Sequence, residues 1–410
     1  MENLAGWSVL TLGACSLLLP AGFQIFLLVL AAGAVGCLMR PSPGVAAPSV
    51  LFPSLVMTLF GIAWIAVAAW HGEFHATWRL VWPVLLAAPI LWVMLSARPN
   101  PAWFWGGLAL GASGAGGWAL FQVVVLDVGR VAGHDPLHAI LFGNLALMQG
   151  LFCLAGLVWG WRQTRRVVWC CVLTMGASLG CLTSLLSGTR GGWIVLPGLL
   201  AICWIAYAGW LTPRRRVQIV VFGALLAVFA VATPQTGVQS RLALGVEHVG
   251  HYLAGERTVA NAARLELWRG ALMLIGDRPV LGWGDAGYLR GMVELSEAGR
   301  LDPATANYWH AHSDVLDAWV RRGALGMLVL LVIYLLPVYL FRKGLRAHDP
   351  ERRALATCGL MLPAGFFGFG LSYSFMVYTV GVAAYAGWFC VIWGLYSSLP
   401  PDAVYSGSSN

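Results

Sequence analysis

Long apolar runs separated by short polar stretches make up most of this chain. Most of them approach the 20 residues that an α-helix needs to cross a bilayer, and their continuous apolarity favours helices over strands, which would alternate. The pattern predicts an all-α polytopic membrane protein with about 12 transmembrane helices. The runs lie near residues 8–20, 21–38, 49–70, 79–96, 102–126, 137–160, 167–186, 191–209, 216–233, 322–341, 354–373 and 377–397.

The first two runs are the least distinct. Residues 7–38 form one apolar stretch that only Pro20 and Gly22 divide. The stretch is too long for a single span, and proline interrupts a helix, so two full spans and a re-entrant or tilted pair both fit. No basic segment precedes it, and we therefore expect it to be retained rather than cleaved as a signal peptide.

One long hydrophilic segment interrupts the apolar pattern. Between Pro234 and Arg322 the chain carries ten acidic residues and nine arginines. This balance argues against a nucleic-acid surface, which would need a basic excess. We expect transmembrane helices 1–9 in residues 1–233, a loop with short helices in 234–321, helices 10–12 in 322–398 and a polar tail in 399–410.

Basic residues in the short loops predict the orientation. With a cytoplasmic N-terminus, thirteen Arg or Lys fall in cytoplasmic loops, whereas the short loops on the opposite side hold only Arg79, Arg130 and Arg190. Positive residues accumulate in cytoplasmic loops, so we expect both termini in the cytoplasm. The long loop and the loop around Arg190 then share the outer face.

Composition narrows the chemistry. Hydrophobic residues make up 59% of the chain and charged residues 10%, which is too apolar for a water-soluble core. The nine cysteines lie in apolar runs, so neither a disulfide framework nor a zinc cluster is expected. The predicted spans hold almost no ionisable groups, whereas transporters keep such groups at mid-depth. The distribution favours chemistry at the membrane surface, with a lipid-linked glycan transporter as an alternative.

A loop of small residues surrounds Arg190, in the sequence Ser187-Gly-Thr-Arg-Gly-Gly-Trp193. Its glycines, Gly191 among them, would let a ligand approach the backbone, and free N–H groups at a helix start suit an anion. A tight turn with an arginine reaching the membrane surface is the alternative interpretation.

A second segment runs from Asn261 to Gly284. Leu265, Trp268, Leu272 and Ile275 recur with helical spacing, which predicts an amphipathic helix on the membrane surface. Gly276-Asp277-Arg278-Pro279 should end it. Arg264, one turn before Trp268, would border the apolar face, where it could bind a ligand or simply pair with an acid or a lipid headgroup.

The third segment, Trp309-His-Ala-His-Ser-Asp314, precedes a helix that leads into the tenth span. Ser313 or Asp314 could cap this helix. The helix dipole disfavours imidazolium at His310 and His312, whereas Asp314 and Asp317 favour it, so the balance is open. His-x-His is also a metal-ligand spacing, but no Cys or His-Glu-x-x-His pattern accompanies it, which favours interfacial histidines over a metal site.

Together these three segments resemble the O-antigen ligase and polymerase superfamily of bacterial envelope enzymes. Within it, the ligases (WaaL) carry His, then Asn, Ser or Gln, nine residues, Gly, two residues and a small residue. His312-Ser313, Gly323 and Gly326 fit this spacing. The polymerases (Wzy) tend to place a Gly eleven positions after an Arg, which neither Arg190 nor Arg264 has. The spacing favours a ligase, with a Wzy-type polymerase as the alternative.

The resemblance implies transfer of polysaccharide from undecaprenyl diphosphate to lipid A-core, at the periplasmic face of a Gram-negative inner membrane, without metal or cofactor. His312 is then expected to take the acceptor's proton, and Arg190 and Arg264 to clamp the diphosphate. Membrane lipids are further expected partners, nucleic acid is not, and the oligomeric state stays open. Residues expected to bind the diphosphate or acceptor are His310, Arg278, Asp277, Arg321, Gly191 and Trp268.

Overall fold

The computed structural model describes residues 2–38, 47–135, 137–233 and 259–400, with a few isolated positions between 239 and 254. The side chains of residues 34–38, 47–48, 190, 226–227, 229–231 and 259–262 lie outside this description, as do most of the loop before residue 259 and the tail from residue 401. Within the described part the regular structure is helical, which confirms the predicted all-α class.

Every predicted apolar run forms helix. Eight helical segments of the described chain are long and apolar enough to cross a membrane, so the chain is a multi-pass membrane protein. The bundle helices are α1 (Glu2–Cys15), α2 (Gly22–Leu38), α3 (Ala47–Trp70), α4 (Phe74–Leu85), α5 (Ala87–Ala97), α6 (Ala102–Val124), α7 (Ala139–Trp161), α8 (Arg166–Ser187), α9 (Arg190–Tyr207), α10 (Pro213–Ala232), α14 (Asp314–Phe341), α15 (Pro350–Gly370) and α16 (Thr379–Ser398).

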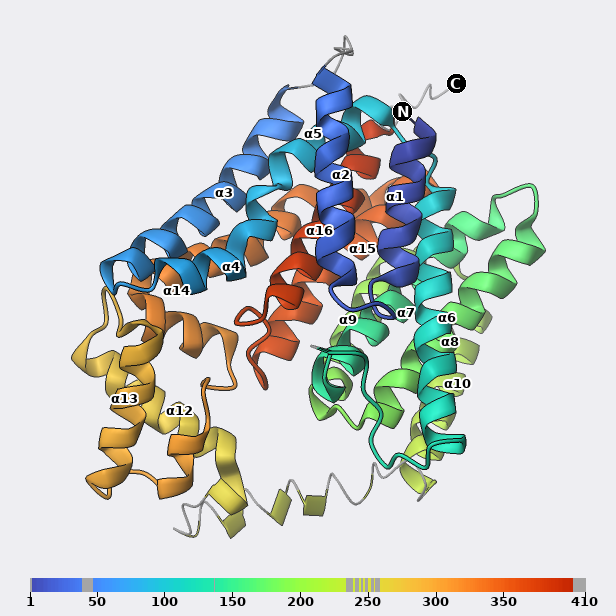
Figure 1. The fold of residues 1–410 in the computed structure, drawn as a ribbon. Coiled ribbons are helices and arrows are strands. Elements are labelled where there is room, and N and C mark those ends of the chain that lie inside the picture. Colours follow the sequence, from blue (N-terminus) through green and yellow to red (C-terminus); the bar gives the residue numbers. More distant parts are fainter. Residues whose placement is uncertain are drawn as a thin grey trace, which may run out of the picture.

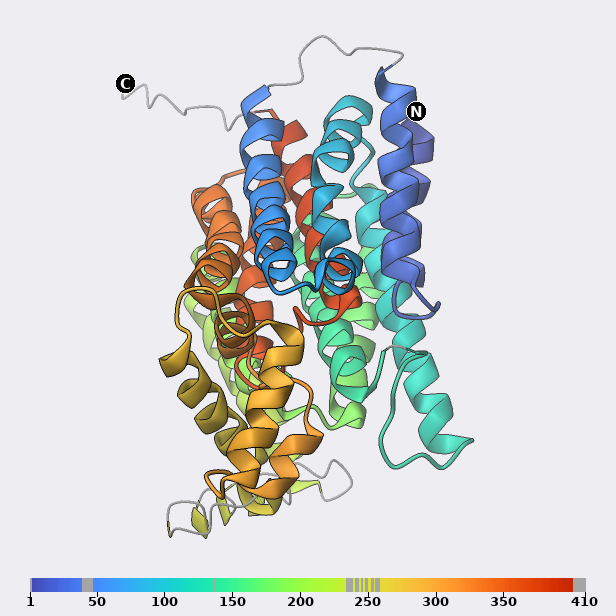
Figure 2. The ribbon, with the colours of Figure 1, turned by 60° about the vertical axis from the view of Figure 1, so that its left-hand side comes forward.

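The bundle is built around α7 and α16. In their apolar windows 83% and 89% of the residues are buried, against 28% for α8 and 22% for α9. Helices α7 and α16 therefore form the interior, and α8 and α9 face outward. Figure 1 shows the hydrophilic helices α12 and α13 at the lower end, opposite the end where α1 begins; Figure 2 confirms this from a second side.

Helices α1 and α2 form a short hairpin. The Gln149 side-chain amide of α7 donates hydrogen bonds to the Gly13 carbonyl (3.1 Å) and to Ser16 Oγ (3.2 Å), and Gly111 of α6 packs against the same carbonyl. Gln149 and Gly111 lie near the middles of their helices, so the hairpin turn reaches only mid-bundle (Figure 1). Residues 7–38 thus form two helices with a turn at this depth, and whether they cross the membrane stays a prediction.

The run predicted at 79–96 begins earlier, at Phe74, and is divided into α4 and α5 at Leu86. Pro83 lies inside α4 and has no N–H to donate to the carbonyl one turn before it, that of Arg79. The Thr379 hydroxyl at the start of α16 donates to this carbonyl instead, at 3.0 Å. The carbonyl left without a backbone donor in α4 thus forms a hydrogen bond that links α4 to α16.

A small hydrophilic domain lies beyond the bundle end. It contains α12 (Val259–Asp277), α13 (Gly284–Glu297) and the 3₁₀ helix η3 (Pro303–Asn307). Helix α12 ends at the Gly-Asp-Arg-Pro sequence, as predicted. Its buried face carries Leu267, Ala271 and Leu274, whereas Leu272 of the predicted apolar stripe is 54% exposed. The stripe prediction is therefore wrong in part, because α12 packs on α13 and α14 with a neighbouring face.

A kink in α14 joins this domain to the bundle. Gly323 has a φ of 64° inside the helix, and a Cβ there would overlap the Val280 carbonyl. Gly282, with φ of 68°, lies opposite: its Cβ would come within 2.6 Å of the Gly323 nitrogen. Only glycine tolerates both conditions. The Gly323 of the ligase-like spacing therefore has a packing role.

Candidate active site

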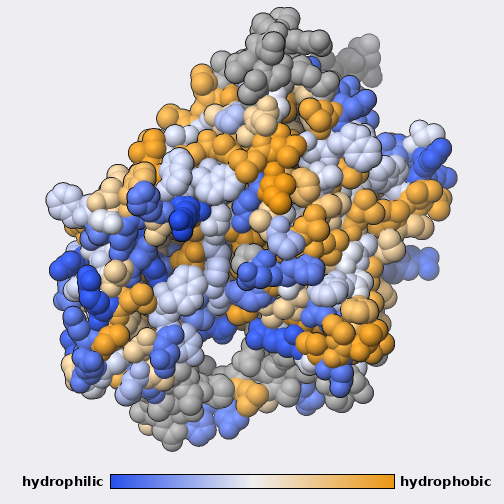
Figure 3. Space-filling view, viewed as in Figure 1, coloured by the Kyte–Doolittle hydropathy of each residue, from blue (hydrophilic) through white to orange (hydrophobic). Residues whose placement is uncertain are grey.

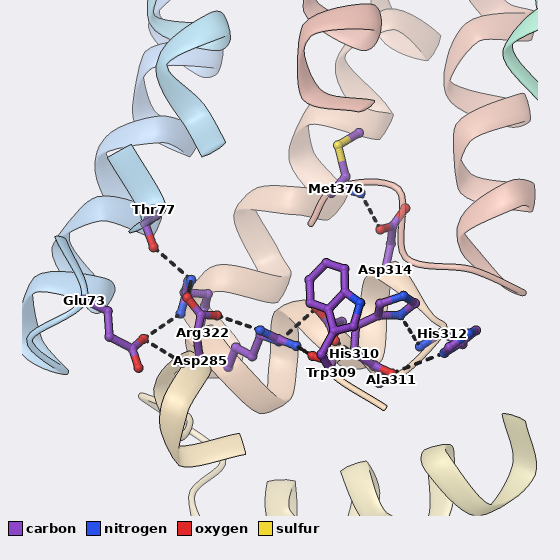
Figure 4. Close-up of polar contacts among 12 residues, drawn as sticks. Glu73, Thr77, Asp285, Trp309, His310, Ala311, His312, Asp314, Arg322 and Met376 are labelled. Atoms are coloured by element: carbon purple, nitrogen blue, oxygen red, sulfur yellow. Dashed lines mark hydrogen bonds and ion pairs between the residues drawn. The ribbon is translucent and has the colours of Figure 1, made fainter. Parts of the chain in front are cut away.

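Two histidines lie in a tight turn just before α14. His312 has a φ of 53°, which is uncommon for a residue with a Cβ. Its N–H donates to Nδ1 of His310 at 3.1 Å, and its own Nδ1 lies 3.2 Å from the His310 carbonyl oxygen. The two rings stack with centroids 4.1 Å apart. The turn therefore fixes both imidazoles in defined orientations (Figure 4).

The segment between α15 and α16 packs against this histidine turn. The Tyr373 ring meets His310 and His312 edge-on, at centroid distances of 4.7 and 5.1 Å. Its hydroxyl lies 3.1 Å from Nε2 of His138 and 2.5 Å from the Tyr378 hydroxyl. Three imidazoles and two phenols thus form one cluster, although the residues are up to 240 positions apart in the chain.

Two buried carboxylates of α14 hold the backbone on both sides of the cluster. Asp317 accepts a hydrogen bond from the Ala311 N–H at 2.8 Å, between the two histidines. Asp314 accepts one from the Met376 N–H, also at 2.8 Å. The capping prediction is wrong, because Ser313 at the N-cap makes no side-chain hydrogen bond to the helix and both carboxylates bind other segments.

Arg321 connects the histidine turn to α13. Its guanidinium makes ion pairs with Asp317 (3.1 Å) and Asp285 (2.8 Å) and donates to the Trp309 carbonyl. The side chain is buried, so these contacts are shielded from water. Arg321 was expected to bind the diphosphate or acceptor. In the structure it holds the histidine turn in place.

The ion-pair network continues to α4. Arg322 bonds Asp285 at 2.8 Å and the Thr77 hydroxyl at 2.9 Å. Glu73 accepts hydrogen bonds from the Asp285 and Ala286 N–H groups, at 2.6 and 2.7 Å, and so satisfies the start of α13. Figure 4 shows this chain of contacts from Glu73 to the histidine turn. The network fixes the hydrophilic domain relative to the bundle.

Burial keeps the imidazoles neutral. Burial and the neighbouring His312 lower the pKa of His310 to about 2. Burial lowers the pKa of His312 to about 4, opposed by its hydrogen bond to the His310 backbone and reinforced by the charge of Arg264. Burial also lowers the pKa of His138 to about 4. The balance left open by the sequence is thus decided for the neutral ring.

Arg264 lies on α12, half-buried. Its positive charge is among the causes that lower the pKa of His312, so its guanidinium is close enough to that ring to act on it. Trp268 follows one helical turn later and is also half-buried. One of the two expected arginines therefore shares the neighbourhood of the expected base.

The loop before α9 reaches the same cluster through its backbone. A Cβ on Gly191 would overlap the Ser372 hydroxyl, and one on Gly192 would lie 2.6 Å from Oδ1 of Asn144. Ser372 directly precedes Tyr373. The start of α9 therefore packs against the residue next to Tyr373. Arg190 stands at this helix start, but its side chain lies outside the described residues.

Asp277 and Arg278 are exposed at the end of α12. Arg278 stacks over the Trp283 ring, 4.1 Å from its centroid. Among the described residues, no hydrogen bond or ion pair joins either side chain to the histidine turn. In the same part of the chain, no group of three or more His, Cys, Asp or Glu is arranged to hold a metal ion.

Sequence reasoning missed several members of the cluster. Tyr373 was assigned to the end of an apolar run, and Tyr378 to the start of the next. The signal that could have found them is the polar interruption at 371–379, where two tyrosines and two serines separate two spans. Asp285 and Glu73 have no local signal, because each is an ordinary acidic residue near a helix start.

A cavity of about 320 Å³ lies beside the cluster, between α3, α4, α13 and α14. Trp309 lines it and also packs edge-on against His310, with centroids 4.7 Å apart. The cavity and the cluster are therefore neighbours. In the view of Figure 3, hydrophilic side chains gather at the lower left, over α12 and α13, and hydrophobic ones cover much of the bundle above.

Comparison with known proteins finds a match for the middle of the chain. Residues 175–331 match the family model described as O-antigen ligase (Wzy_C). This part of the multi-pass membrane protein is therefore similar to the O-antigen ligase family, in line with the resemblance carried by the three motifs. The matched segment contains the Arg190 loop, α12 and the histidine turn.

The chain is also similar to an uncharacterized protein of Haemophilus influenzae. The two are 27% identical over 204 residues, which are 50% of this chain and 51% of that protein. The matched region thus spans about half the length of this relative.

Proposed function

We propose that this protein is an O-antigen ligase, which transfers polysaccharide from undecaprenyl diphosphate to the lipid A-core oligosaccharide. The observation that carries the proposal is a neutral, fixed imidazole, His312, near Arg264, inside a segment that matches the O-antigen ligase family. On this proposal the bundle lies in the inner membrane with both termini cytoplasmic. The domain of α12 and α13 then faces the periplasm.

The proposed reaction is a glycosyl transfer. An acceptor hydroxyl oxygen attacks the anomeric carbon, and the bond from that carbon to the diphosphate oxygen breaks. Undecaprenyl diphosphate leaves with the electron pair, and His312 takes the hydroxyl proton. A pKa near 4 leaves the ring unprotonated at neutral pH, as a base requires. No metal or cofactor enters this scheme.

Arginine suits the leaving group. Its planar guanidinium presents a fork of donors that matches diphosphate oxygens, and a partly buried donor is worth more than one in water. We assign this role to Arg264 and Arg190, with the glycine at 191 allowing close approach of the phosphate to the start of α9. Loss of one such donor costs about 3 kcal/mol of transition-state stabilisation.

The remaining expected residues take different proposed roles. His310 and Arg321 are buried, and we assign them to holding His312 in place. Trp268 and Asp277 lie on α12 and Arg278 directly follows it, and part of the surface of each is exposed. We assign these three to contacts with the glycan or diphosphate outside the cluster.

Transfer by the purified protein in liposomes tests the proposal. His312→Ala and Arg264→Ala should each lower the transfer rate at least about 100-fold, because each removes a group that acts at the reacting centre. His75→Ala and Arg290→Ala remove matched, exposed side chains and should keep the rate. Wild-type rates in both site variants, with normal insertion, would refute the assignment.

The polymerase alternative shares the donor but not the acceptor. Deleting the gene and separating the lipopolysaccharide on a gel tells the two apart. Loss of a ligase leaves bare lipid A-core while polymer accumulates on its carrier, whereas loss of a polymerase leaves cores with a single repeat. The His312 to Gly326 spacing favours the first pattern.

A further inference from the structure

Three arginines and two carboxylates line the cavity beside Trp309. Arg79, Arg321 and Arg322 line it, against the two carboxylates of Asp285 and Asp317. Both carboxylates are already bound to Arg321 or Arg322. Arg79 is exposed at the cavity, and its guanidinium makes no hydrogen bond or ion pair with the described residues. The cavity therefore offers one cation that the protein does not neutralise.

Arg322 adds unused donors at the same place. Its side chain is 97% buried, since only 3% remains exposed, yet its Nε has no hydrogen-bond acceptor among the described residues. Its Nη1 reaches Glu73 only at 3.7 Å. Buried guanidinium donors are normally satisfied. An acceptor-rich group in the cavity would satisfy them.

The start of α16 adds further positive potential to the cavity. Thr379, the first residue of this 20-residue helix, lines the cavity and bonds the Arg79 carbonyl at 3.0 Å. The N-terminal end of a helix carries partial positive charge and favours anions. Arg79, Arg322 and this helix start together make the cavity a site for a phosphate-like group.

Apolar side chains also line the cavity. They are Trp64, Leu80 and Leu289, and Leu289 is 39% exposed. Trp309, 45% exposed, presents a large ring of the kind on which sugar rings stack. Because Trp64 and Leu80 belong to bundle helices, whereas Leu289 and Trp309 belong to the hydrophilic part, the fitting ligand is an amphiphile that combines a phosphate, sugar and lipid.

Resting on the proposed function, we propose that this cavity binds the phosphorylated lipid anchor of the acceptor glycolipid, with Arg79 as the principal cation. The donor has a separate place, because Arg264 and the start of α9 lie at the histidine cluster, and none of their residues lines the cavity. Figure 4 shows His312 directed away from Arg322, with Trp309 and His310 between them. An acceptor whose reacting hydroxyl lies several sugars from its phosphate spans this distance.

Steady-state transfer separates the two substrates. Arg79→Ala should raise the KM for lipid A-core at least tenfold, and leave the donor KM and the kcat at saturating acceptor unchanged. Arg79→Lys should recover most of the acceptor affinity. Arg290→Ala, which removes an exposed arginine of α13 outside the cavity, should leave all three constants unchanged. An unchanged acceptor KM, or an increase in the donor KM instead, overturns the inference.

Binding without donor separates this inference from the proposed function. Native mass spectrometry of the full-length protein would compare lipid A-core, its phosphatase-treated form, phosphatidylglycerol and inorganic phosphate. Preferential binding of the phosphorylated glycolipid, lost in Arg79→Ala and in the cavity-filling Leu289→Trp, supports the inference even if the wild type transfers no glycan. Equal binding of phosphatidylglycerol or of free phosphate overturns it.

Discussion

Replacement of Asp317 by asparagine tests whether the histidine turn is held from α14. The carboxylate is 1% exposed, with one oxygen on the Ala311 N–H and the other on Arg321. Asparagine has the same size but carries an NH₂ in place of one oxygen. Whichever way the amide turns, a donor then faces either Ala311 N–H or the guanidinium. One buried donor must lose its acceptor.

The magnitude follows from this single lost contact. A hydrogen bond to a charged group contributes about 1.5–3 kcal/mol, and Arg321 keeps its second ion pair with Asp285. We expect destabilisation of about 2 kcal/mol. The effect on transfer should be larger, because displacement of a catalytic group by about 1 Å can cost 100-fold in rate. Ala311 stands between the two histidines, and Arg321 bonds the Trp309 carbonyl just before them. Loss of either contact therefore moves the turn.

Two measurements separate positioning from general damage. The transfer rate per folded protein should fall about 100-fold in Asp317→Asn, since the catalytic ring is displaced. Acylation of imidazoles by diethyl pyrocarbonate, read by mass spectrometry, should become faster at His310, which is 2% exposed in the wild type. Glu294→Gln, at an exposed carboxylate on α13, should change neither. A wild-type rate in Asp317→Asn would refute the reasoning.

Two further predictions concern the base and the kink. The kcat/KM for the donor reports the free enzyme, so its acidic limb should lie near pH 4, where His312 titrates. Arg264→Ala removes a positive charge that lowers this pKa, and should move the limb of the remaining activity to higher pH. A wild-type limb near pH 6.5 would contradict the burial of the ring. Gly323→Ala should abolish the peak of folded protein in size-exclusion chromatography in detergent, because its φ is positive and its Cβ would overlap the Val280 carbonyl. In the matched control Gly276→Ala the added Cβ meets open space, and the protein should elute normally.

The membrane helices could be predicted well because their signal is local. A run of about 20 apolar residues specifies a span whatever lies around it. The depth of the α1–α2 hairpin could not be predicted in this way. It depends on where Gly13 meets Gly111 and Gln149, more than 90 positions later in the chain. Such contacts leave no periodic pattern in the sequence.

The site residues likewise fall into those with a local sequence signal and those placed by distant contacts. His312 and Arg264 belong to recognisable motifs, and the structure brings them into one neighbourhood. The groups that hold His312 come from distant helices: Tyr373 is 61 positions away, and its hydroxyl partner His138 lies far earlier in the chain. The place of the Arg190 side chain stays a prediction, since only its backbone is described.

The low pKa of His312 becomes useful when both substrates are considered. A base with a pKa near 4 is always unprotonated at neutral pH but accepts protons weakly. Part of that weakness comes from the positive charge of Arg264, and the proposed donor brings a diphosphate anion to the same guanidinium. Opposite charges nearby cancel in their effect on a third group. Donor binding should therefore raise the basicity of the ring. The negative charge that develops on the diphosphate as its bond to the anomeric carbon breaks should raise it further. On the proposed function, His312 becomes a stronger base only when a glycan is in place to be transferred.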